Sequence, residues 1–205
     1  PVGTSAVRSL GMTQTDLRGG VYYWASTIEG QVVRYEFGRE GARPEVFLQG
    51  PNPFACVGCH VLSRDGTRMA ATYGMPGFPQ TQLIDVATRM QRGPSLGTNF
   101  GSFSPDNRRY IASTGSVLSL YNAETAMPML GLEANTTGSH PDWSPSGDFV
   151  VYSRPRQTIA LPVGMPGHSG PADLMLLRWM TSTFGAPRAL VESQGENNYY
   201  PGFSP

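Results

Sequence analysis

The two cysteines of the chain lie three residues apart and are followed at once by a histidine, in Cys56-Val-Gly-Cys59-His60. Cys-x-x-Cys-His is the spacing in which two thiols add to the vinyl groups of a haem while the next imidazole binds the iron. The pattern therefore predicts one covalently attached haem c, with Cys56 and Cys59 as the anchors and His60 as the proximal iron ligand.

Other chemistries use paired cysteines, and each requires a different context. A disulfide between Cys56 and Cys59 suits an exported β-protein and stays open as an alternative. A thioredoxin-like redox site needs a βαβ pattern, which this sequence lacks. A structural zinc site needs four ligands, and no second cysteine pair exists.

The ligand on the other side of the iron has three candidates. The same Gly-Met-Pro-Gly turn signal occurs twice: Met75 lies within the first copy, Gly74-Met-Pro-Gly77, and His168 directly follows the second, Gly164-Met-Pro-Gly167. His140, which opens a later hairpin segment, is the third candidate. Each also has a simpler interpretation as a turn residue. An imidazole would lower the reduction potential and a thioether would raise it, so the choice affects function.

A hairpin signal recurs along the chain at a period of roughly 40 residues, typical of blade-like repeats. An apolar residue precedes Ser-Pro-Asp-Gly or a variant, with the serine at Ser63, Ser104, Ser144 and Ser204. Gly or Asn supplies the positive φ that such turns require. The interval before the last copy is longer, which we interpret as a loop insertion at about residues 155–173.

β-rich runs follow each hairpin signal. We predict second strands at 68–73, 109–114 and 149–153, and third strands at 82–86, 117–121 and 174–179. Earlier runs at 21–26, 31–37 and 44–48 are interpreted as the later strands of one more unit. The predicted fold is all-β: a single β-propeller domain over residues 1–205, with about four blades of four antiparallel strands, forming part of a larger propeller.

These hairpins resemble the WD40-like propeller repeats of TolB-type proteins, and His140-Pro-Asp-Trp-Ser-Pro-Ser-Gly147 is the clearest match. The stretch that begins at Cys56 also resembles bacterial propeller proteins in which Cys-x-x-Cys-His runs directly into a Ser-x-Asp-Gly hairpin. With Ser63 aligned to Ser144, Cys59 falls on His140. We therefore expect the haem motif in the loop that leads into the innermost strand of a blade, on the face where propellers bind ligands.

Composition excludes several classes of function. Fifteen basic residues balance fifteen acidic ones, and the scattered arginines form no stripe that could bind nucleic acid. No apolar run approaches the ~18 residues of a membrane helix, and no signal peptide is visible at the N-terminus. Because haem c is attached outside the cytoplasm, we expect a periplasmic or extracellular bacterial protein.

The expected function is electron transfer with redox proteins or other cytochromes as partners. The alternative is a TolB-like binding or scaffold module without haem, in which Cys56 and Cys59 form a disulfide. A haem oxidoreductase with an open iron position ranks last, because no paired carboxylates or Ser-His-Asp arrangement suggest catalytic residues.

Overall fold

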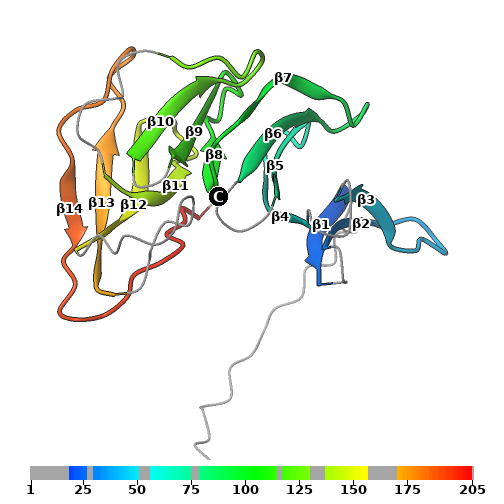
Figure 1. Ribbon diagram of the computed structural model, residues 1–205, viewed down its shortest axis with the longest axis horizontal. Coiled ribbons are helices and arrows are strands. Elements are labelled where there is room, and N and C mark those ends of the chain that lie inside the picture. The colour runs from blue at the N-terminus through cyan, green and yellow to red at the C-terminus, as the bar shows by residue number, and fades with distance from the viewer. Residues whose placement is uncertain are drawn as a thin grey trace, which may run out of the picture.

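Four antiparallel β-sheets stand side by side in a computed structural model of the chain, which describes residues 19–26, 30–50, 56–74, 79–114, 117–129, 137–156 and 170–204. Figure 1 shows the sheets fanned around a common centre, to which the C-terminal end of the chain returns. Each sheet is built from strands that are consecutive in the sequence. This is the arrangement of propeller blades.

The first two sheets contain the N-terminal half of the chain. The first has the order β1-β2-β3 and the second the order β4-β5-β6-β7. Their strands are β1 (Gly19–Ala25), β2 (Gln31–Phe37), β3 (Glu45–Gln49), β4 (Cys56–Leu62), β5 (Arg68–Gly74), β6 (Gln80–Asp85) and β7 (Gln91–Leu96).

The third and fourth sheets follow in the same manner. The third has the order β10-β9-β8 and the fourth the order β11-β12-β13-β14. Their strands are β8 (Gly101–Phe103), β9 (Arg109–Thr114), β10 (Val117–Asn122), β11 (Ser139–Trp143), β12 (Phe149–Pro155), β13 (Ala172–Arg178) and β14 (Arg188–Val191). Strand β8 contacts both β4 and β11, so the first strands of three successive sheets lie next to one another.

The core lies between the sheets, because alternate residues of a strand point to opposite faces. On β9, Tyr110 and Ala112 pack toward the second sheet, while Ile111 between them packs toward the fourth. On β5, Met69 and Ala71 pack in a third cluster, toward the first sheet. The strands therefore carry apolar side chains on both faces, as expected for sheets covered on each side.

Each complete hairpin contains the same hydrogen bonds around its serine. Ser63 Oγ donates to Asp65 Oδ1 at 2.7 Å and accepts from the Arg68 amide at 2.9 Å. Ser104 and Ser144 accept in the same way from the amides five residues on, at 3.0 Å in both cases. The predicted left-handed turn residues are confirmed as Gly66, Asn107 and Gly147, with φ between 55° and 81°.

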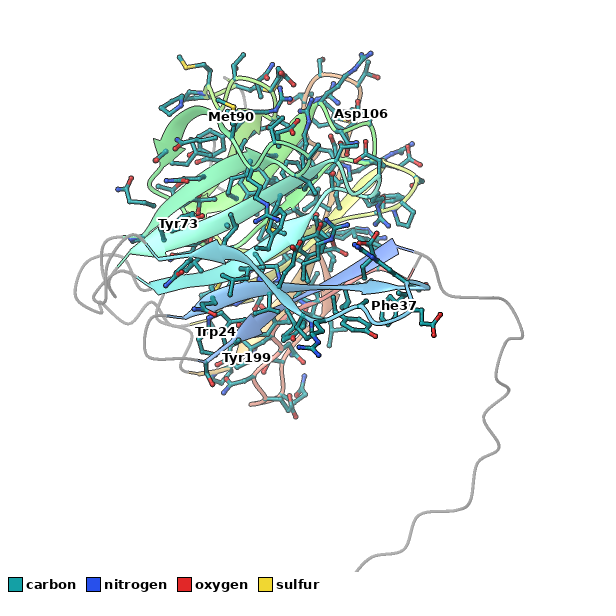
Figure 2. The ribbon with its side chains drawn as sticks, turned by 90° about the vertical axis from the view of Figure 1, so that its right-hand side faces the viewer. Trp24, Phe37, Tyr73, Met90, Asp106 and Tyr199 are labelled. Atoms are coloured by element: carbon teal, nitrogen blue, oxygen red, sulfur yellow. The ribbon has the colours of Figure 1, made fainter. Side chains whose placement is uncertain are left out.

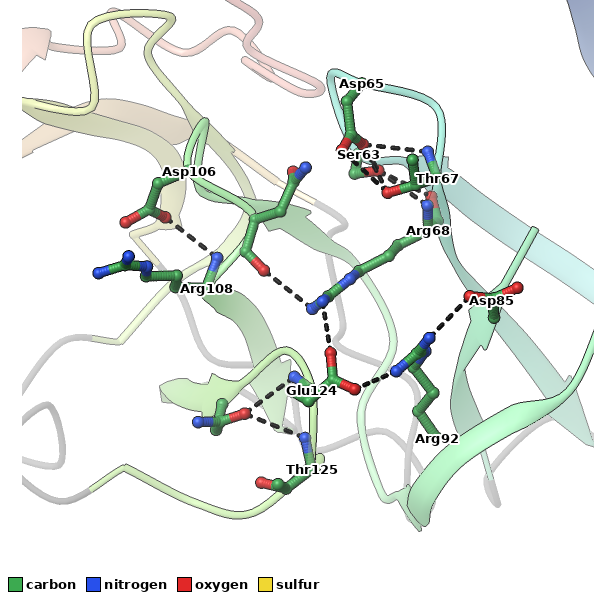
Figure 3. A network of polar contacts seen from close by, with 12 residues as sticks. Ser63, Asp65, Thr67, Arg68, Asp85, Arg92, Asp106, Arg108, Glu124 and Thr125 are labelled. Carbon is green, nitrogen blue, oxygen red and sulfur yellow. Dashed lines mark hydrogen bonds and ion pairs between the residues drawn. The ribbon is translucent and has the colours of Figure 1, made fainter. Parts of the chain in front are cut away.

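Polar contacts on the turns join the second sheet to the third (Figure 3). Arg68 donates to the Asn107 carbonyl at 2.9 Å and pairs with Glu124. Arg92 pairs with Glu124 and also with Asp85, at 2.7 Å. Hydrogen bonds from Arg92 and from Thr88 lower the pKa of Asp85 to about 2. These contacts add specificity to the packing of neighbouring sheets.

The all-β prediction is confirmed, with two differences in detail. Among the described residues, the sheets at β1–β3 and β8–β10 have three strands rather than four. The haem motif lies within β4, not in a loop before it, because pairing with β5 continues as far as Cys56 opposite Gly74. Residues 157–169, most of the predicted insertion, are outside the described ranges. No helix in the described ranges is long and apolar enough to cross a membrane.

Candidate functional site

The Cys-x-x-Cys-His motif is interrupted by a β-bulge. Val57 pairs with Tyr73 and His60 with Ala71, so Gly58 and Cys59 together oppose Thr72. In a regular strand, positions three apart fall on opposite faces. The extra residue shifts the alternation of faces by one position. Positions 56 and 59 therefore fall on the same face of β4.

Strand β4 is an edge strand of its sheet, and a cavity of about 630 Å³ adjoins it. Cys59 and Val61 line the cavity from one face of the strand, and His60, the neighbour between them, also contributes to the lining. Residues from both faces of β4 therefore line the cavity, because β4 is at the edge of its sheet. Figure 2 shows Trp24, another lining residue, at the end of the molecule opposite Asp106 of the second hairpin.

Equivalent positions of the four repeats converge on this cavity. Cys59, Phe100, His140 and Tyr200 each lie four residues before a hairpin serine, and all four line the cavity. The residues one step later in each repeat line it as well: His60, Gly101, Pro141 and Pro201. The repeat therefore builds the site, because each copy of the inner segment contributes two adjacent residues to the lining.

Three of these equivalent side chains contact one another. The rings of Phe100 and His140 stack with centroids 3.7 Å apart and planes at 24°. Tyr200 meets His140 edge to face at 4.3 Å and Phe100 at 5.8 Å. Stacked and edge-to-face ring pairs stabilise by about 0.5–1.5 kcal/mol each beyond their buried area. The cluster therefore forms a rigid wall of the cavity.

The backbone at His140 and Tyr200 adopts a conformation that is uncommon for residues other than glycine. Their φ angles are 50° and 46°, in the left-handed region that costs a side-chain-bearing residue of the order of 1–3 kcal/mol. At His140 the strain coincides with a bulge, because Ser139 pairs with Ser153 and Asp142 with Val151. Ser139 Oγ lies 2.6 Å from His140 Nδ1 and fixes the ring.

Asp142 anchors the C-terminal part of the wall. Its Oδ1 accepts a hydrogen bond from Ser102 Oγ at 3.1 Å, and its Oδ2 accepts one from the Phe203 amide at 2.8 Å. Farther back, the Asn198 carbonyl accepts from Ser153 Oγ at 2.6 Å. The segment that carries Tyr200 is thereby held against β11 and β12, although Tyr200 itself is 71% exposed.

Two tyrosines lie within electrostatic reach of Cys59. Burial raises the pKa of Tyr110 above its ordinary value, and negative charge on Cys59 raises it further. The pKa of Tyr200 is raised for the same two reasons, burial first. Both phenols therefore stay neutral at physiological pH, so they can donate hydrogen bonds into the cavity and add no negative charge there.

The residues that line the cavity fit a haem. Two cysteine positions on one strand face, an adjoining imidazole and a largely apolar cavity are compatible with the donors and the surroundings of haem c. Trp24 closes one side, where its indole N–H donates to the Val57 carbonyl at 2.9 Å. Among the residues that the structure describes, no cluster of three His, Cys, Asp or Glu side chains could hold a bare metal ion.

The predicted site residues divide into two groups. Cys59, His60 and His140 line one cavity, whereas Met75 and His168 lie outside the described residues. Cys56 is placed through its backbone pairing with Gly74. Sequence reasoning missed Phe100, Tyr110 and Tyr200. The repeat alignment that matched Cys59 to His140 also matches them to Phe100 and Tyr200, so extending it to every copy would have found two of the three.

Comparisons with known proteins show the fold of the chain and no more. No family profile and no curated protein matches it. Among solved structures, TolB from Acinetobacter baumannii is 17% identical with a TM-score of 0.55, over 84% of this chain and 41% of that one. A putative TolB from Agrobacterium tumefaciens is 14% identical with a TM-score of 0.56, over 88% of this chain and 64% of that one.

A third similarity is to the peptidase prolyl oligopeptidase B from Galerina marginata. It is 11% identical with a TM-score of 0.57, and the match covers 85% of this chain but 30% of that one. The chain thus spans less than two thirds of the length of each of these proteins. At such identities the shared feature is the architecture: this chain has the β-propeller fold found in TolB and in prolyl oligopeptidase.

Proposed function

We propose that the chain is an electron-transfer β-propeller module with one haem c attached at Cys56 and Cys59 and ligated by His60. The observation that carries the proposal is the convergence of the motif on a cavity. Cys59 and His60 open into a space of about 630 Å³, within the range of ligand and cofactor sites in proteins. The bulge in β4 that aligns the two cysteine positions supports the same function.

Attachment needs only the two thiols and the two vinyl groups. Each thiol adds across one C=C bond, the sulfur bonding to one carbon and the hydrogen to the other, so no atom leaves and no oxidant is consumed. The protein mass then rises by that of one whole haem. Cys59 is exposed, which suits a thiol that must meet an attachment enzyme after export.

In this proposal His60 would bind the iron through Nε2. Its Nδ1 lies 3.4 Å from the Gly58 carbonyl, the kind of backbone acceptor that orients the outer nitrogen of a ligating imidazole. A haem bound here would supply one-electron chemistry, through the ferric and ferrous states of its iron. Trp24, Phe100 and Tyr110 contribute apolar surface to the lining of the site, and the polarity around a haem is one of the means by which a protein sets the potential.

The proposed location and partners follow from the cofactor. Haem c is attached outside the cytoplasm, so we place the protein in the periplasm or outside the cell, with redox proteins or other cytochromes as partners. Cys59 and Tyr200 are exposed at the cavity. This exposure offers a partner close access to one edge of the cofactor.

The test compares the native chain with Cys59→Ser and Cys56→Ser variants, each produced in a host that attaches haem c. The native chain should gain one haem in intact mass and show a c-type pyridine haemochrome spectrum. Each single variant should lose one thioether, and the double variant should lose covalent haem altogether. Native protein that carries no haem under these conditions would refute the proposal.

A second candidate function rests on the similarity to TolB. A propeller without haem would use the same cavity to bind a protein or another ligand, and Cys56 and Cys59 would form a disulfide. Its signature is an intact mass two hydrogens below that of the reduced chain, with no haem absorbance. Because the haem-loaded protein is heavier, one mass spectrum separates the two functions.

A further inference from the structure

We propose that His140 provides the second axial ligand of the iron, through Nε2, and that Ser139, Phe100 and Tyr200 position its ring. The inference rests on the proposed haem site and adds the residue that faces it. Of the described residues, His60 and His140 are the two imidazoles that line the cavity. They come from β4 and β11, the first strands of two different sheets.

The ring nitrogens of His140 have separate roles. Nδ1 lies 2.6 Å from Ser139 Oγ, so coordination falls to Nε2. A ligating histidine usually holds its other nitrogen in a hydrogen bond, which fixes the tautomer and the ring orientation. Ser139 is itself fully buried, and this pairing therefore persists without competition from bulk water.

Two aromatic rings pack against the imidazole of His140. Phe100 stacks on one face at 3.7 Å, and Tyr200 approaches edge to face at 4.3 Å. His140 is 6% exposed in spite of lining the cavity. Phe100 covers one face of the ring, and the nitrogen lone pair lies at the edge of the ring, which this stacking leaves uncovered. Phe100 and Tyr200 thus restrict rotation of the ligand.

The backbone supports a functional role for the same residue. His140 has a φ of 50°, a conformation that persists only when its surroundings enforce it and that concentrates at functional sites. Pairing of β11 with β12 is broken at this point by the bulge. The equivalent position in the second sheet is Cys59, the haem anchor, which also lies in a bulge. The two bulges therefore turn equivalent positions of two blades into the cavity.

The decisive variant is His140→Gly in haem-loaded protein. Glycine accepts the positive φ, so the change removes the imidazole without adding backbone strain. We expect the native protein to be six-coordinate and low-spin by absorbance and electron paramagnetic resonance. The variant should keep its covalent haem by mass but become high-spin and bind carbon monoxide when reduced. Added free imidazole should restore the low-spin spectrum by filling the vacated space.

His140→Asn is the matched second variant, because asparagine also tolerates this conformation and keeps a polar side chain. It should lose the low-spin spectrum as the glycine variant does. Met75→Ala and His168→Ala, the other two candidates, should leave the spectrum unchanged. Circular dichroism of all four variants shows whether the fold persists.

Separate outcomes overturn the two proposals. A native protein without haem in its mass spectrum refutes the haem function and this inference with it. A protein with covalent haem whose low-spin spectrum survives His140→Gly, or is lost in Met75→Ala or His168→Ala instead, overturns the assignment of His140 alone. So does a haem-loaded native protein that is already high-spin.

The role of Ser139 has its own readout. Ser139→Ala should keep the low-spin spectrum but speed the displacement of His140 by carbon monoxide in reduced protein severalfold, and Ser139→Thr should restore the slow rate. An unchanged rate in Ser139→Ala would show that the hydroxyl does not position the ligand. A purely structural serine would change the unfolding midpoint and leave this rate unaltered.

Discussion

Two positions of the repeat, four residues apart, differ in how much their side chains vary from copy to copy. At the hairpin, Ser63, Ser104 and Ser144 are buried and accept a hydrogen bond from the amide five residues on in each copy. At the cavity, the four equivalent residues have four different side chains: Cys59, Phe100, His140 and Tyr200. The hairpin position is a serine in every copy, whereas the cavity position has a different residue in each.

The difference reflects what each position must satisfy. Every hairpin has to bury the same backbone amides, so the same hydroxyl recurs wherever the turn recurs. The cavity position faces its counterparts from other sheets rather than its own backbone. Its side chain can therefore differ from copy to copy, and the four copies carry a cysteine, two aromatic rings and a histidine there.

The largest expected effect comes from removing a core side chain next to a hairpin serine. Trp143 is 1% exposed and packs against Trp179 and Phe184, so Trp143→Ala should lower the free energy of unfolding by about 3–5 kcal/mol. Denaturant unfolding measures the change. Tyr200→Ala is the comparison at the cavity position: because Tyr200 is 71% exposed, it should cost about 1 kcal/mol or less. Equal losses would contradict the proposed division between core and cavity.

A smaller effect should follow from adding a methyl group to an inner strand. A Cβ at Gly101 would lie 2.3 Å from the Tyr110 hydroxyl and 2.6 Å from the Ile111 carbonyl. Gly101→Ala should therefore destabilise by about 1–3 kcal/mol through overpacking. Gly58→Ala is the matched control in β4, because its nearest neighbour would be 4.0 Å away. Thermal unfolding of both variants tests the pair, and a tolerated Gly101→Ala would show that Tyr110 moves aside easily.

The smallest effect concerns one hydroxyl of the hairpin. Ser104 is 1% exposed, donates to Asp106 and accepts from the Arg109 amide, so Ser104→Ala should cost about 1–2 kcal/mol. Ser204, the exposed serine of the last repeat, is the control, and Ser204→Ala should be close to neutral. The comparison uses unfolding midpoints in denaturant. A neutral Ser104→Ala would mean that the recurrence of serine does not reflect stability.

Much of the architecture could be predicted because its signals are local. The turn residues at Gly66, Asn107 and Gly147 were identifiable from the need for positive φ, and the strands that follow them from their β-branched and aromatic content. Burial was harder to predict. Phe103 and Trp143 are buried, whereas Leu62 and Phe203, at the same position of the repeat, are only partly buried. Burial at this position depends on how the neighbouring sheet packs against the strand.

Local patterns in the sequence predict the order of the strands, the hairpins and the Cys-x-x-Cys-His motif, because spacing and turn chemistry act between near neighbours in the chain. The position of the motif in the folded chain and its neighbours in space depend on how the sheets pack. The tertiary structure placed the motif in a bulged edge strand, and it brought His140 and Phe100 into the same cavity from other sheets. Those contacts join residues roughly 40 to 140 positions apart, and sheet packing, which no local pattern encodes, determines which of them meet.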